Sequence, residues 1–176
     1  IQGIIPCIAD EHVGIGAAIA GDAVYNGAMD NASGVATLLE AAKAVAAARP
    51  RRSVVVVAVT AEEKGLLGSR YYALNPTVPK DGIVANINMD MFLPLFPLKT
   101  LMVLGLDESE LGDDVRAVAA AVQVGVQADP EPQRNRFIRS DQYSFVREGV
   151  PALALMVGYD EGSPEATIAA DWTRER

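Results

Sequence analysis

The fold is decided by the stretch SVVVVAVTAEEKGLLGS, which runs from Ser53 to Ser69. Its first seven residues are almost all β-branched, and such a continuous apolar run is expected of a strand that is covered on both faces. Two adjacent glutamates, Glu62 and Glu63, follow directly. They have a structural explanation, because Thr60 and Glu63 form the T-x-x-E pattern of a capping box at a helix start. The alternative is that the two carboxylates serve a chemical site at the end of the strand.

Predicted strands and helices alternate along the rest of the chain. We expect strands at 1–9, 53–59, 83–89, 100–106 and 152–157, helices at 31–48, 62–74, 108–124 and 140–148, and a glycine-rich loop from residue 10 to residue 27. This alternation predicts an α/β fold, a three-layer α/β/α sandwich with a mostly parallel mixed sheet. In such folds, ligands bind outside the carboxyl ends of the strands.

Composition limits the function classes. The 176 residues are 50% hydrophobic and carry a net charge of −8, which argues against binding to a nucleic-acid backbone. No apolar stretch reaches the ~20 residues of a membrane helix. The single cysteine, Cys7, excludes an internal disulfide and a cysteine-rich zinc site. The abrupt start and end predict that residues 1–176 form one domain, truncated at both ends.

Acidic residues follow several of the predicted strands or precede a helix. Asp30 comes just before a helix, Glu62 and Glu63 follow the second strand, and Asp90 closes the third. Singly, each has a structural explanation: Asp30 and Asn31 suit a helix cap, and Asp90 suits a turn. Together they would repel one another and raise their pKa values unless a cation neutralised them. The set therefore points to a metal site.

Four segments resemble the co-catalytic zinc aminopeptidases of metallopeptidase family 28. They are NGAMDNASGVATLLEAAKA, VVVVAVTAEEKGLLGSRYY, ANINMDM and RSDQYSFVREGVPALAL. The resemblance implies a zinc-exopeptidase catalytic domain that binds two zinc ions, acts on peptides and is secreted or periplasmic. By position in these motifs, Asp30 would bridge the two ions, Glu63 and Asp90 would each bind one, and Glu62 would be the general base.

The resemblance also implies a mechanism. A water held between two ions attacks the scissile carbonyl, and Glu62 carries its proton to the leaving amine. An anchored α-amino group would make the enzyme an exopeptidase. We further expect Arg139, Ser140 and Asp141 to contact the substrate, with plain helix capping as the alternative.

The chain departs from the family pattern at two metal positions. The family motif His-x-Asp-His-x-Gly reads ADEHVG here, so Ala9 stands where a ligand histidine is expected, and His12 matches a position that is not a ligand. The last ligand histidine follows a segment resembling DWTRER, where this sequence ends. Catalytic zinc prefers some nitrogen ligands, whereas an all-oxygen set suits Mg, Ca or Mn. We therefore expect impaired zinc binding and poor hydrolysis.

Two other readings remain open. A catalytically inactive pseudo-peptidase, serving as an interaction or scaffold module, would explain Ala9. A glutaminyl-cyclase-like domain with one metal would share the fold, although the intact EE and DNASG motifs favour the two-metal design. A histidine at position 9 in the natural sequence would favour the enzyme over the pseudo-peptidase.

Overall fold

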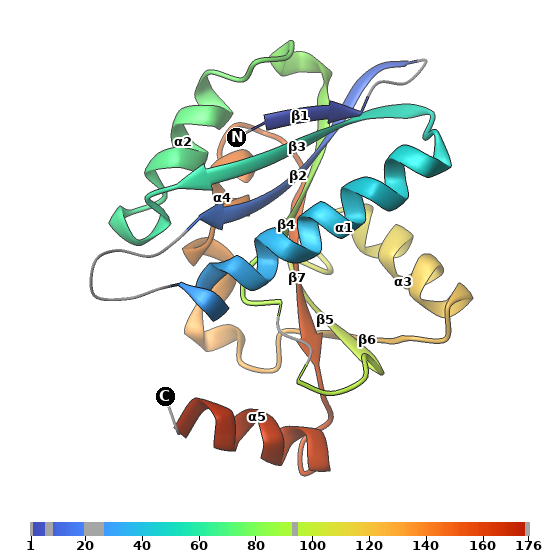
Figure 1. Cartoon of the computed structure of the whole chain (residues 1–176), viewed down its shortest axis with the longest axis vertical. Coiled ribbons are helices and arrows are strands. Elements are labelled where there is room, and N and C mark those ends of the chain that lie inside the picture. The colour runs from blue at the N-terminus through green and yellow to red at the C-terminus, as the bar shows by residue number, and fades with distance from the viewer. Residues whose placement is uncertain (1, 6–8, 20–26, 93–94, 175–176) are drawn as a thin grey trace.

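The computed structural model describes residues 2–5, 9–19, 27–92 and 95–174. In these ranges the strands form one sheet in the order β1-β3-β2-β4-β7-β5-β6 (Figure 1). They are β1 (Gln2–Ile5), β2 (Ala9–Ile19), β3 (Arg52–Thr60), β4 (Ile83–Met89), β5 (Thr100–Leu104), β6 (Gly125–Ala128) and β7 (Ala152–Gly158). β1 runs antiparallel to β3 and β5 antiparallel to β7, while the other neighbours are parallel. The predicted mostly parallel mixed sheet is confirmed.

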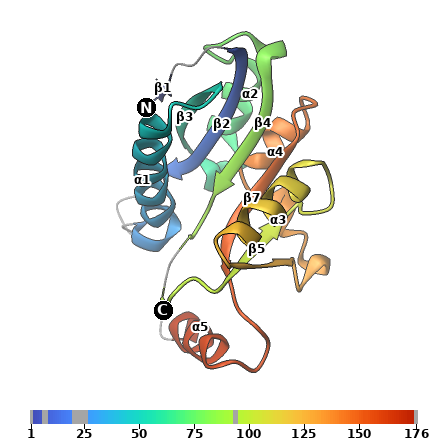
Figure 2. The ribbon, with the colours of Figure 1, turned by 90° about the vertical axis from the view of Figure 1, so that its right-hand side faces the viewer.

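Helices cover both faces of this sheet, and Figure 2 shows α1 and α2 on opposite sides of β2 and β3. The helices are α1 (Ser33–Ala48), α2 (Leu67–Leu74), α3 (Leu111–Ala121), α4 (Gln142–Val146) and α5 (Pro164–Arg174). On one face, Leu38 of α1 packs on Val54, and Leu155 joins this cluster to the one beneath α3. On the other face, Val55 packs against Tyr72 of α2. The predicted three-layer sandwich is confirmed.

The strand predicted at residues 53–59 is present as β3 and is covered on both faces, as expected. Val54 and Val55 are both buried although adjacent strand residues point to opposite faces. Both faces of β3 must therefore be covered. The other two apolar runs, 83–89 and 152–157, correspond to β4 and β7, which also lie inside the sheet.

The prediction for residues 10–19 is wrong, and residues 20–26 of the predicted loop lie outside the described part of the chain. The stretch expected to be a glycine-rich loop contains β2, which pairs with both β3 and β4. The strand expected at 1–9 is the shorter β1, and residues 6–8 lie outside the described part. Gly14, Gly16 and several alanines give β2 a weak strand signal, because strand propensity comes mainly from branched and aromatic side chains. The sequence also gave no sign of β6 or α5.

Two predicted helices start later than expected. Residues Ala28–Ala32 form a separate turn, η1, in which Asp30 and Asn31 have non-helical backbone angles. The predicted helix 62–74 divides into a short turn, η2 (Glu62–Lys64), and α2, because Gly65 adopts a φ of 95°. The capping box predicted there is wrong, since no side chain caps η2. The strand at 100–106 and the helices at 108–124 and 140–148 are shorter, as β5, α3 and α4.

Leu38 and Leu39 offer a matched test of the core assignment. Their exposed fractions are 1% and 55%, although they are neighbours on α1. We expect Leu38→Ala to lower the free energy of unfolding by about 2–5 kcal/mol, because it leaves a cavity beside Val54. Leu39→Ala should change it by less than about 0.5 kcal/mol. Urea unfolding measures both, and equal losses would contradict the assigned packing.

Candidate metal and catalytic site

Asn31 follows Asp30 in the turn before α1. Its side chain is fully buried, and its Oδ1 accepts a hydrogen bond of 2.9 Å from the backbone N–H of Gly34. Asn31 therefore caps the start of α1, as the sequence suggested.

The same amide joins two loops that are far apart in the sequence. Asn31 Nδ2 donates to the carbonyl of Met89 at 2.9 Å, and Asn31 Oδ1 also accepts from the N–H of Met91 at 3.0 Å. These two residues flank Asp90. The loop with Asp30 is thereby held against the loop with Asp90.

Asp90 is held from its other side by a buried network. Ser140 Oγ donates to Asp90 Oδ2 at 2.6 Å and accepts from Asn88 Nδ2 at 3.0 Å. Asn88 Nδ2 also donates to Gln142 Oε1 at 2.9 Å, and Gln142 Nε2 donates to the carbonyl of Phe137 at 2.5 Å. The segment before α4 is thus tied to the end of β4.

The acids that the sequence singled out interact electrostatically. The pKa of Glu62 is raised to about 7, first by burial and then by the neighbouring carboxylates of Asp141, Asp90, Glu63 and Asp30. Burial also raises the pKa of Asp141 to about 6. Burial raises the pKa of Asp90, although the hydrogen bond from Ser140 acts in the opposite direction and lowers it. These shifts are what a cluster of partly desolvated like charges produces.

The donor chemistry of this cluster fits a divalent cation. Partial desolvation, the charge of Asp30 and a hydrogen bond with Asp30 raise the pKa of Glu63, so a cation beside these two carboxyls would relieve their repulsion. Asp90 Oδ1 is buried and has no hydrogen-bond partner among the described residues. In the same part of the chain, however, no three Asp, Glu, His or Cys side chains already stand in a ligating arrangement. Metal binding would need small side-chain rotations.

The strand register corrects the expectation for position 9. Ala9 pairs with Arg52 and His12 with Ser53, at the start of β3. The acids follow Thr60, at the opposite end of that strand. The backbone therefore places position 9 away from the edge that carries the cluster, where the family pattern led us to expect a ligand position.

The three residues expected to contact substrate differ in position. Ser140 and Asp141 are buried, and Ser140 holds Asp90. Neither caps a helix, since no side chain caps α4. Arg139 is exposed and lines a cavity of about 440 Å³ together with Glu62 and Glu63. Of these three residues, only Arg139 is exposed beside the acids, where a ligand can contact it.

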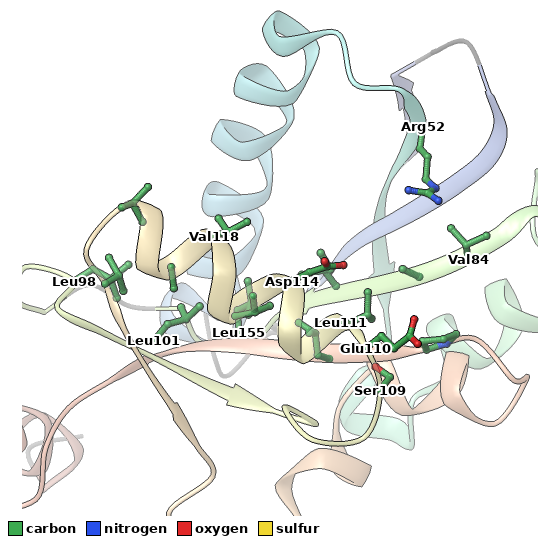
Figure 3. Close-up of a pocket in the computed structure, with 18 residues that line it drawn as sticks. Arg52, Val84, Leu98, Leu101, Ser109, Glu110, Leu111, Asp114, Val118 and Leu155 are labelled. Atoms are coloured by element: carbon green, nitrogen blue, oxygen red, sulfur yellow. The ribbon is translucent and has the colours of Figure 1, made fainter.

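A larger cavity lies elsewhere. It measures about 880 Å³ and runs beneath α3, where Val118 and Leu111 face Leu155 and Leu101 (Figure 3). Its lining is mostly apolar, and none of the predicted site residues contributes to it. It is separate from the acid cluster.

Sequence reasoning missed Asn88, Gln142 and Trp172. Asn88 is an amide inside an apolar strand, which was a visible signal, since buried polar groups need partners. Nothing in the sequence around Gln142 indicated that its side chain would be buried. Trp172 Nε1 donates to Met29 Sδ at 3.0 Å and so brings α5 beside the turn that carries Asp30.

Stability should depend on pH through Glu62. Its pKa rises from an ordinary 4.5 to about 7, so between these values the folded protein keeps a proton that the unfolded chain loses. Folding stability of the metal-free protein should therefore fall as pH rises from 4.5 to about 7 and level off above.

Glu62→Gln should remove part of this fall, so its stability advantage over the wild type should grow with pH. Urea unfolding in a chelator, at pH values across that window, measures the difference. The exposed Glu161→Gln is the control and should follow the wild type. Parallel pH curves for the wild type and Glu62→Gln would contradict the assigned shift.

Comparison with known proteins places the chain among metallopeptidases. Curated relatives include a probable zinc metalloprotease of Pyrenophora tritici-repentis (strain Pt-1C-BFP), 42% identical over 65 residues, which are 37% of this chain and 15% of that protein. A probable zinc metalloprotease of Pyricularia oryzae (strain 70-15 / ATCC MYA-4617 / FGSC 8958) is 43% identical over 63 residues, 34% of this chain and 12% of that protein. The chain therefore spans a small part of the length of these relatives.

Solved structures share the fold. A zinc aminopeptidase from Bacillus subtilis matches 93% of this chain and 41% of its own, with a TM-score of 0.73 and 23% identity. An aminopeptidase from Aneurinibacillus sp. strain AM-1 matches 92% of this chain and 39% of its own, with a TM-score of 0.72 and 22% identity. The sequence model of Peptidase family M28 matches residues 10–175. Because that match covers nearly the whole chain, the protein belongs to peptidase family M28.

Proposed function

We propose that this chain is the catalytic part of an aminopeptidase that removes N-terminal residues from peptides. The observation that carries the proposal is the raised pKa of Glu62, about 7, at the centre of a carboxylate cluster. A group that titrates near neutral pH both accepts and releases a proton readily under working conditions. The acidic surroundings also favour a protonated α-amino group, which suits an exopeptidase.

Asp30, Glu63 and Asp90 are the residues that would hold divalent cations, zinc by family. When bound, the ions would supply a water of lowered pKa and an electrophile for the carbonyl. Glu62 accepts a proton from the attacking water as the carbon–oxygen bond forms. It then donates that proton to the amine nitrogen as the carbon–nitrogen bond breaks. Asn31 and Ser140 keep the two aspartates in position through their hydrogen bonds.

Glu62→Gln tests this role. The variant cannot accept the proton, so we expect hydrolysis of leucyl-anilide, measured with added zinc or manganese, to fall by about 100-fold or more. Bound metal, measured by elemental analysis, should stay the same, because Glu62 is not a proposed ligand. Glu161→Gln, outside the cluster, should retain wild-type activity.

The alternative is a pseudo-peptidase that serves as an interaction or scaffold module. It is favoured by the oxygen-only donors, since the sequence has a single histidine, His12, at the far edge of the sheet. Metal binding without hydrolysis of any aminoacyl substrate would support it. Equal activity of the wild type and Glu62→Gln would exclude the proposed base. Export, which the family resemblance implies, stays a prediction.

A further inference from the structure

The cavity beside Glu62 is lined by both acidic and basic side chains. It is formed by η2 with the start of α2 on one side and by η5 (Arg136–Arg139) with α4 on the other. Its lining residues are Glu62, Glu63, Gly65, Leu66, Arg70, Ile138, Arg139, Tyr143, Ser144 and Arg147. Acids and arginines thus share one space of about 440 Å³.

Three of the lining residues are arginines from three separate segments. Arg70 lies on α2, Arg139 ends η5, and Arg147 follows α4. None of them forms an ion pair with an acidic side chain in the described ranges, although the protein has 23 acidic and 15 basic residues. Four other arginines do form such pairs, namely Arg116, Arg134, Arg136 and Arg174. Unpaired guanidinium groups that converge in an acidic protein are available to an anionic ligand.

The arginines do not neutralise the acids that line the same cavity. None of the three forms an ion pair with Glu62 or Glu63 in the part of the chain that the structure describes. A ligand in this cavity would therefore meet both carboxylates and guanidinium groups that are available to it.

The remaining lining suits a short carbon chain. Leu66, Ile138 and Tyr143 supply apolar surface to the same cavity. Arginine recognises carboxylates through two parallel N–H···O bonds, which gives geometric selectivity as well as attraction. The matching ligand has an ammonium group, a short apolar segment and a carboxylate.

We propose that this pocket selects peptides with a carboxylate close to the scissile bond, held by Arg70, Arg139 and Arg147. The carboxylate comes from an acidic N-terminal side chain or from the free C-terminus of a dipeptide. That the bound peptide is cleaved next to Glu62 rests on the proposed function, whereas the preference for a carboxylate-bearing ligand does not.

Binding in the Glu62→Gln background separates the two sources, because cleavage of the ligands is suppressed. Calorimetry compares glutamic acid α-amide with glutamine amide, which differ only in the side-chain carboxylate. It also compares Leu-Gly with Leu-Gly-amide, which differ only at the C-terminus. We expect the carboxylate-bearing member of one pair to bind about tenfold tighter, as a charge-assisted bond would give. The pair that discriminates identifies the source.

Arg70→Gln and Arg139→Gln, added to this background, should each reduce the preference severalfold. Arg51→Gln removes an exposed arginine outside the pocket and should leave it unchanged. Thermal unfolding checks that all variants fold. Equal binding within both pairs, or a preference that survives both pocket variants, would overturn the inference. A preference in a protein that hydrolyses nothing would retain the pocket and refute the proposed function.

Discussion

The buried amide of Asn31 is the interaction on which the candidate site depends. It connects the turn before α1 to the end of β4 with two hydrogen bonds and accepts a third from Gly34 of α1, so it holds the loop of Asp30 against the loop of Asp90. A Cβ at Gly34 would lie against the same amide and the carbonyl of Met89. The DNASG motif is therefore a packing requirement as much as a chemical one: its aspartate, its asparagine and its glycine form one unit.

The groups that hold the acids together are themselves uncharged. Asn31, Asn88 and Ser140 fix Asp90 through amide and hydroxyl hydrogen bonds, and no basic side chain is used for this in the described ranges. A lysine or arginine in their place would lower the pKa of the acids and satisfy their charge. Because these residues are neutral, they hold the carboxylates close together without neutralising their charge. The cluster thus keeps its attraction for a cation, at a cost in stability that packing elsewhere offsets.

Much of the fold could be predicted because β3, β4 and β7 are continuous apolar runs, a local signal that survives without tertiary information. The acids could be predicted as a group because parallel strands deliver their ends to one edge. The register of β2 could not be predicted, because its glycines and alanines give a weak strand signal and its position is set by pairing with β3 and β4. Nor could the bond from Ser140 to Asp90, because it joins residues 50 positions apart through the packing of α4.

The register of β2 also bears on the choice of metal. His12 is the only histidine of the 176 residues, and its strand partners lie at the amino ends of β3 and β4. Any nitrogen ligand for the acid cluster would have to come from residues outside this sequence. With oxygen donors alone, affinity depends on the charge of carboxylates whose pKa values are raised, as for Glu63 and Asp90. Protons then compete directly with the cation for the same oxygens, so metal binding by these residues must weaken as the pH falls.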